Sequence, residues 1–196
     1  MGKYTAISEM SRAILRILRR ELVPDTIQNP DAIGLCSPDD RGDFVVGIHL
    51  YDIKTSEEIR ANSMVPQGTG SSRYPSCFVN LFYMITVHSI GDIKFRSEEE
   101  QKVLGKVVQA LHDNSCLDAQ TLEPVSVRKP MDVVIQMQTL ELEEKVRIYN
   151  VPNAGYKLSL FYKAAPVEIE SLKTKQVSRV TDMEFTVEQQ QGGADL

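Results

Sequence analysis

The sequence predicts an α+β fold with about four strands and two or three helices. Segments 44–53 and 77–88 are apolar on both alternations, which is typical of strands inside a sheet. Segments 6–22, 97–112 and 139–149 instead repeat apolar residues every three or four positions, as helices with one buried face do. The 196 residues, of which 42% are hydrophobic and 25% charged, have the length and composition of one globular domain.

Segment 6–22 is the first predicted helix. Thr5 or Ser8 can cap its start, and Pro24 stops it. Its buried stripe is expected to consist of Ile7, Met10, Ile14, either Ile17 or Leu18, and Leu22.

Four arginines stack on one side of this helix. We call them the arginine face: Arg12, Arg16, Arg19 and Arg20. With Lys3 and Glu9 they give residues 1–20 a net charge of 5 − 1 = +4, whereas the whole chain carries −5. Such a face is commonly solvated surface, but arginine also grips carboxylates with two parallel hydrogen bonds. The arginine face is therefore either plain surface or a docking face for an acidic partner.

The first predicted strand, 44–53, follows a turn at 39–43 and continues into a polar stretch at 54–63. Segment 66–75 is so rich in Gly, Ser and Pro that we expect a long mobile loop. Its G-x-G triplet lacks the helix start and the Lys-Ser/Thr pair of a phosphate-binding loop. We therefore predict no nucleotide site there.

The second predicted strand, 77–88, carries bulky groups on both faces and is expected near the centre of the sheet. Ser97 and Glu100 then have the spacing of a capping box at the start of the second helix. Glu98, Glu99 and Glu100 together place negative charge at the positive end of that helix. We call these three residues the acidic start and treat them as a second candidate interface.

The last third of the chain predicts a strand at 133–138, a short helix capped by Thr139, and a strand at 156–162. Pro166 is expected to break this strand and leave 167–169 as a short edge piece. From Ser171 onward the chain is polar, so we expect a domain over 1–170 and a C-terminal extension over 171–196. Apolar residues in this extension are expected to order against a neighbour: Val177, Val180, Met183, Phe185 and Val187.

The cysteines and histidines, which are the residues most often found in catalytic and metal sites, are widely separated in the sequence. The cysteines at 36, 77 and 116 have neither disulfide nor metal-ligand spacing, and the histidines at 49, 88 and 112 complete no catalytic motif. We expect no enzyme activity, cofactor or metal. The acidic balance argues against nucleic acid as a partner, and no apolar run is long enough to insert in a membrane. Synthesis in the cytoplasm is expected.

The order of several sequence segments resembles that of a known protein family. Leu50-Tyr51-Asp52-Ile53 is followed by Asn80-Leu81-Phe82-Tyr83-Met84-Ile85-Thr86 and by Gln109-Ala110-Leu111-His112-Asp113, and the series ends with segments 156–162 and 165–169. From about Ala6 to Ile169 the chain resembles the N-terminal domain of cap, or tail-terminator, proteins of phage-tail-like contractile injection systems.

The resemblance implies a small mixed, mainly antiparallel sheet flanked by helices, with no known catalysis. It implies a structural cap that forms a hexameric ring, binds tube and sheath proteins at the distal end of the particle, and fixes its length. Ring subunits joined head to tail each need two different complementary faces. The arginine face, the acidic start and the apolar extension are our candidates. An adaptor module of the baseplate or cargo is the alternative, and a small enzyme is a more remote one.

Overall fold

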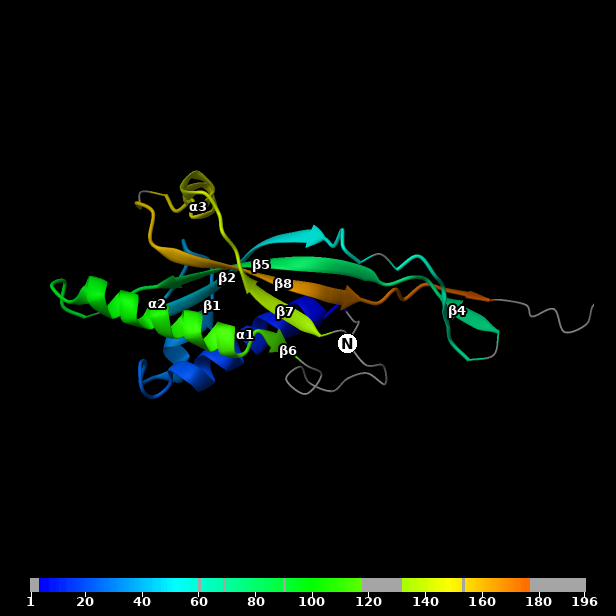
Figure 1. Cartoon of the computed structure of the whole chain (residues 1–196), viewed down its shortest axis with the longest axis horizontal. Helices are drawn as coiled ribbons and strands as arrows, with labels where there is room; N and C mark the ends of the chain where they lie inside the picture. Colours follow the sequence, from blue (N-terminus) through cyan, green and yellow to red (C-terminus); the bar gives the residue numbers. More distant parts are fainter. Residues whose placement is uncertain are drawn as a thin grey trace, which may run out of the picture.

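The computed structural model describes residues 4–59, 61–68, 70–89, 91–117, 132–152 and 154–176, which form an elongated body with a projecting arm (Figure 1). The helices are α1 (Ala6–Leu22), α2 (Arg96–Asp113) and α3 (Leu142–Ile148), with a 3-10 turn η1 at Pro30–Ala32. The strands of the body are β1 (Ile33–Leu35), β2 (Val46–Thr55), β5 (Cys77–Val87), β6 (Cys116–Leu117), β7 (Val133–Met137) and β8 (Ser159–Ile169). The strands of the arm are β3 (Val65–Pro66), β4 (Ser71–Arg73) and β9 (Thr174–Gln176).

In the described part of the chain, the body is one six-stranded sheet in the order β1-β2-β5-β8-β7-β6. Its pairs are antiparallel except for the parallel pair β1·β2. Both β2 and β5 have neighbours on either side, so the prediction of two central strands is confirmed, as is the mixed, mainly antiparallel sheet. The strand count exceeds our expectation because β1 and β6 have only three and two residues, too few for a periodic pattern.

Helices α1 and α2 pack against each other and cover one face of the sheet. Every second residue of β5, including Leu81, Tyr83 and Ile85, is buried in the core that they share with the sheet. The predicted stripe of α1 is buried from Met10 to Leu22, with both Ile17 and Leu18 inside. Burial of each such side chain stabilises the fold by about 1.5–3 kcal/mol.

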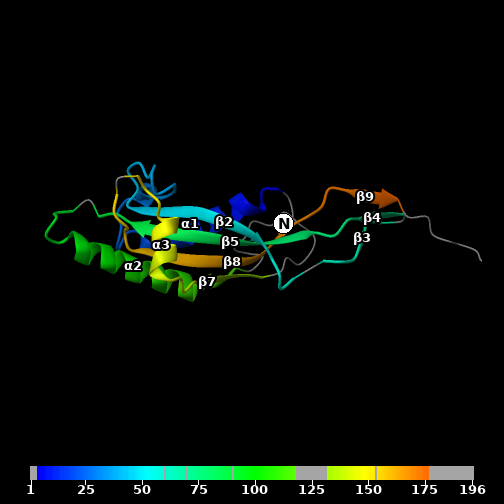
Figure 2. The same cartoon turned by 90° about the horizontal axis from the view of Figure 1, so that it is seen from above.

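Short helix α3 lies over part of the opposite face (Figure 2). Met84, which points away from the main core, forms a second apolar cluster with Phe161 and Tyr149. Tyr51 joins this cluster because the register of β2 against β5 shifts between Leu50 and Asp52. This bulge makes Tyr51 an extra residue, and its ring meets the Phe161 ring edge-on at 5.8 Å.

The predicted caps of α2 and α3 are wrong, whereas Thr5 does occupy the cap position of α1; the three helices themselves are confirmed. Ser97 lies inside α2, whose cap position is Phe95, and Glu100 binds partners outside the helix. Glu141 caps α3 in place of Thr139 and forms a capping box with Glu144. At α1, Thr5 occupies the cap position but donates its hydroxyl to the Glu9 carboxylate at 2.6 Å.

Pro166 does not break β8, which runs unbroken to Ile169; this prediction is also wrong. The ladder with β7 ends at Ala165, so no hydrogen bond is required from position 166 on that side. On the other side, the register of β8 against β5 shifts between Val79 and Leu81, which leaves Ala165 and Pro166 opposite Asn80. A proline is tolerated at such a bulge.

The segment that we expected to be a mobile loop, 66–75, is part of the arm. Strands β3 and β4 form a hairpin, and β9 pairs with β4 to complete a small antiparallel sheet beyond the end of the body. The glycines are needed for the backbone conformation of the turn, because Gly68 and Gly70 have positive φ angles of 65° and 94°. The described start of the C-terminal extension is thus an edge strand on its own chain.

Candidate assembly surfaces

The arginine face is only partly available to a partner. Arg19 donates to the Ile33 carbonyl oxygen at 2.9 and 3.2 Å and lies 3.6 Å from Asp31, which ties α1 to β1. Arg20 donates to Asn114 at the end of α2, at 2.6 Å. Arg12 and Arg16 are exposed on the same side of α1. Arg20 is exposed as well, and the use of this face as an interface stays a prediction.

The three carboxylates of the acidic start differ in their partners: Glu98 and Glu99 are exposed, and Glu100 is partly buried. Glu98 pairs with Lys102 one turn along the helix at 2.7 Å, and this hydrogen bond lowers the pKa of Glu98. Glu99 accepts a hydrogen bond from the Ser89 hydroxyl. Glu100 accepts from Lys157 at 2.7 Å and from the Ser89 amide at 3.0 Å. The last two residues therefore fasten α2 to the loops around it.

Glu100 is the central group of that anchor. Burial opposes its ionisation, but the hydrogen bonds from Lys157 and the Ser89 amide outweigh burial and hold its pKa below the ordinary value. Its neighbour His88 is neutral, because burial first, and then the charges of Arg41 and Lys157, lower the pKa of His88 to about 4. This cluster therefore stabilises the junction of α2 with the sheet.

The arm is held by a second ion pair, which the sequence patterns did not indicate. Arg73 on β4 and Glu170 at the end of β8 lie 2.5 Å apart and are both largely shielded from water. Next to them, the Tyr74 amide donates to the Lys173 carbonyl, and the Lys173 ammonium lies 4.6 Å from the centre of the Tyr74 ring. These contacts fix the direction of the arm and present β9, whose three residues are exposed, along its edge.

The apolar residues of the extension lie outside the described residues. Val177, Val180, Met183, Phe185 and Val187 all follow Gln176, the last residue of β9. Their assignment to an interface therefore stays a prediction.

The candidate chemical residues do not come together. His49, His88 and His112 lie on β2, after β5 and in α2, and within the described ranges no three His, Cys, Asp or Glu residues are grouped as metal ligands. The three cysteines are free, with Cys77 and Cys116 exposed and Cys36 half-buried. Among the helices that the structure describes, none has the length and apolar character needed to cross a bilayer.

Comparison with known proteins identifies related chains. A family model described as the Pvc16 N-terminal domain matches residues 9–182. The chain is similar to the PVC sheath/tube terminator of an extracellular contractile injection system in its extended state, with a TM-score of 0.68 and 20% identity over 99% of this chain and 67% of that one. It is also similar to the tube-terminating cap of the anti-feeding prophage, with a TM-score of 0.61 and 20% identity over 91% of this chain and 60% of that one. No curated protein matches the sequence.

Proposed function

The chain belongs to the Pvc16 N-terminal domain family, and from this membership we propose that it is a terminator, which caps the tube and sheath of a contractile injection particle. The observation that carries the proposal is the fold shared with the PVC sheath/tube terminator over 99% of the chain. The two similar structures are a terminator and a cap, so we propose a structural role rather than catalysis. Capping ends polymerisation and thereby fixes particle length.

We further propose that six copies form a closed ring, in which the body spans 1–170 and the extension from 171 reaches a neighbouring subunit. The chain spans about two thirds or less of the two similar structures, 67% and 60%. A ring joined head to tail needs two unlike surfaces on each subunit. The basic side of α1 and the projecting arm are unlike surfaces of this kind. Tube and sheath proteins are the proposed partners, in a particle made in the cytoplasm and released.

Deletion of the gene tests this proposal. Electron microscopy of particles from the deletion strain should show variable lengths or failed assembly, and expression of the chain from a plasmid should restore a single length. Particles of normal, uniform length in the deletion strain would contradict the terminator role. Loss of cargo or of the baseplate at normal length would favour an adaptor instead.

A further inference from the structure

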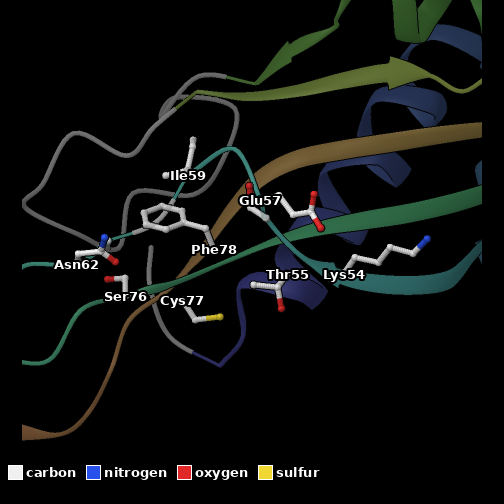
Figure 3. Close-up of a pocket in the computed structure, with 10 residues that line it drawn as sticks. Lys54, Thr55, Glu57, Ile59, Asn62, Ser76, Cys77 and Phe78 are labelled. Carbon is white, nitrogen blue, oxygen red and sulfur yellow. The ribbon is translucent and has the colours of Figure 1, made fainter.

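The arm leaves the body beside a hollow of about 610 Å³ (Figure 3). Figure 3 shows Asn62 and Ser76 on the two segments that lead into β3 and back from β4. The charged residues that line the hollow are one cation and one anion, Lys54 and Glu57. Charge therefore selects no partner at the base of the arm. The free edge of β9, farther along the arm, does select one.

The outer edge of β9 presents backbone groups to a further strand. β9 is the last strand of the arm sheet, so within the described residues no strand pairs with that edge. The Tyr74 amide donates to the Lys173 carbonyl at 2.9 Å. Because backbone groups alternate in direction along an antiparallel strand, the amides and carbonyls of Thr174 and Gln176 point away from β4. These four groups are the ones that an added strand would bind.

The opposite edge of the arm sheet is blunted by a proline. The Gln67 amide donates to the Ser71 carbonyl at 2.9 Å, so the backbone of the preceding residue, Pro66, faces away from β4. Pro66 has no amide hydrogen to offer at that edge. Proline on an outer edge opposes strand addition. A further strand is therefore directed to β9 rather than to β3.

The arm sheet lacks the apolar layer that a small sheet needs. A sheet of three strands is stable when one of its faces is hydrophobic or packed. β4 and β9 consist entirely of polar residues, and β3 contributes Val65 and Pro66. Leu172, directly before β9, is 90% exposed. A strand with apolar side chains on one face would supply the missing layer.

The charge of this edge indicates an acidic strand. Within the described residues 61–68, 70–76 and 170–176, Glu170 is the one acid, and it is paired with Arg73 at 2.5 Å. The other charged residues there are Lys173 and Lys175, which lie two positions apart and so share a face. Like charges oppose pairing between two copies of β9. A strand with two carboxylates two residues apart is complementary to the lysines.

The C-terminal extension contains such a strand pattern at residues 182–188. Polar and apolar residues alternate there at every position, as in a strand with one apolar face: Asp182-Met183-Glu184-Phe185-Thr186-Val187-Glu188. The acids at 182 and 184 fall on one side, and the three apolar residues fall on the other. One arginine and four acids give the extension 177–196 a net charge of 1 − 4 = −3.

The chain between β9 and this pattern is unsuited to a hairpin. Residues 177–181 read Val-Ser-Arg-Val-Thr and contain no Gly, Pro, Asn or Asp, the residues that hairpin loops use. Val177, Val180 and Thr181 are β-branched and favour extended chain. Five extended residues carry the chain roughly 17 Å past Gln176. The pattern is thus directed away from its own β9 and toward the β9 of a second copy.

We propose that residues 182–188 of one copy add as a strand to the free edge of β9 in the next copy. This inference rests on the proposed ring and names one of its subunit contacts. Asp182 and Glu184 face Lys173 and Lys175, while the apolar residues of the strand cover the opposite face of the arm sheet. Each subunit gives a strand to one neighbour and receives one from the other. Such a head-to-tail contact closes into a ring.

Cross-linking between two differently tagged chains tests the contact. One chain carries Thr174→Cys and the other Phe185→Cys, and Cys77→Ser with Cys116→Ser removes the exposed native thiols from both. The two chains are expressed together during particle assembly, and purified particles are oxidised under mild conditions. We expect a disulfide-linked dimer that bears both tags.

Glu184→Cys is the matched control for Phe185→Cys. It is the adjacent residue but lies on the opposite side of the proposed strand, so its sulfur points away from position 174. It should give at least fivefold less linked dimer. Met183→Cys and Val187→Cys, on the same side as Phe185, sample the two neighbouring registers.

Charge reversal tests the lysine side of the contact. Lys173→Glu with Lys175→Glu should lower the yield of linked dimer about fivefold, since two exposed pairs are lost. Asp182→Lys with Glu184→Lys in the partner chain should restore the yield. Restoration separates a lost charge pairing from a damaged arm, which the partner's lysines would not repair.

The outcomes separate the contact from the function. If the chain is present in particles but no dimer bears both tags in any register, the proposed contact is wrong. A disulfide that closes within one chain carrying both Thr174→Cys and Phe185→Cys, without mixed dimers, would assign the strand to its own β9 and overturn the exchange. Equal linking by Glu184→Cys would overturn the proposed faces. If the chain is absent from particles, the terminator role fails, and the contact built on the ring falls with it.

Discussion

Removal of the Glu100 carboxylate should destabilise the protein far more than removal of Glu98, although both lie in the first turns of α2. In Glu100→Ala, Lys157 loses its partner at 2.7 Å and the Ser89 amide loses its acceptor. The side chains of Glu100 and Lys157 are only 18% and 24% exposed, so water replaces these bonds poorly. Hydrogen bonds to charged groups contribute about 1.5–3 kcal/mol. With the residual exposure, we expect a loss of about 2–3 kcal/mol in the free energy of unfolding.

Glu98→Ala is the matched control. The pair of Glu98 with Lys102 has the same 2.7 Å distance, but both side chains are about two-thirds exposed. Water screens an exposed pair of this kind, so its loss should hardly change the free energy of unfolding. Urea denaturation followed by circular dichroism measures both variants, and the slope should be unchanged while the midpoint of Glu100→Ala falls. Equal midpoints for the two variants would refute the role of Glu100 as an anchor.

The same variant has a predictable pH dependence. The pKa of Glu100 is lower in the folded protein than its ordinary value. Its stabilising contribution is therefore complete above the pKa of the unfolded chain, about 4.3, and is lost as pH falls through the lower folded value. The gap in unfolding free energy between the parent and Glu100→Ala should be constant from pH 6 to 8 and shrink below about pH 4. A gap that widens on acidification would contradict this assignment.

Three further predictions concern α1 and the arm. Arg19→Ala should cost about 1–2 kcal/mol in urea denaturation through the lost bonds to the Ile33 carbonyl, whereas Arg12→Ala should stay within about 0.5 kcal/mol; equal losses would contradict the distinction. Gly68→Ala forces a side chain into a positive φ, so amide exchange in the arm should quicken while the melting temperature holds; unchanged exchange would argue against a structured turn. Arg12→Glu with Arg16→Glu should weaken assembly measured by light scattering at low salt and less so at high salt, and parental assembly at both would make the arginine face ordinary surface.

The elements that sequence patterns predicted are those whose own residues contain the signal. β5 is apolar on both sides because most of its residues are buried on both faces of the sheet, and β2 is buried in the same way at its start, over Val46–Ile48. Helix α1 shows its buried stripe through five residues at helical spacing, from Met10 to Leu22. Both patterns arise from the burial of neighbouring residues, so they can be recognised in a short window of sequence.

The failures depend on partners far along the chain. Ser97 and Glu100 have the spacing of a cap, but Glu100 is taken by Lys157, 57 residues away. The Gly- and Ser-rich segment 66–75 looks unstructured until β9 pairs with β4. Pro166 would break a strand that is paired on both sides. It is tolerated because the ladder between β7 and β8 ends at Ala165, which leaves position 166 unpaired on that side. None of these partners is visible in a local pattern.

Whether the arginine face is an interface stays a prediction, but the exposure of its residues can be compared with the pattern. Arg12 and Arg16 remain exposed, as helical spacing indicated, whereas Arg19 is used to fix α1 to β1. The exposure of Ile93 and Phe95 just before α2 was not predicted, because two apolar residues in a turn have no periodicity.

The position of the chain in the particle tests the terminator role most directly. A gold-binding tag placed after Leu196 can be located by electron microscopy on intact particles. A terminator should carry label at one end only, opposite the baseplate, on nearly every particle of normal length. Label along the sheath, at the baseplate, or absent from intact particles would contradict it.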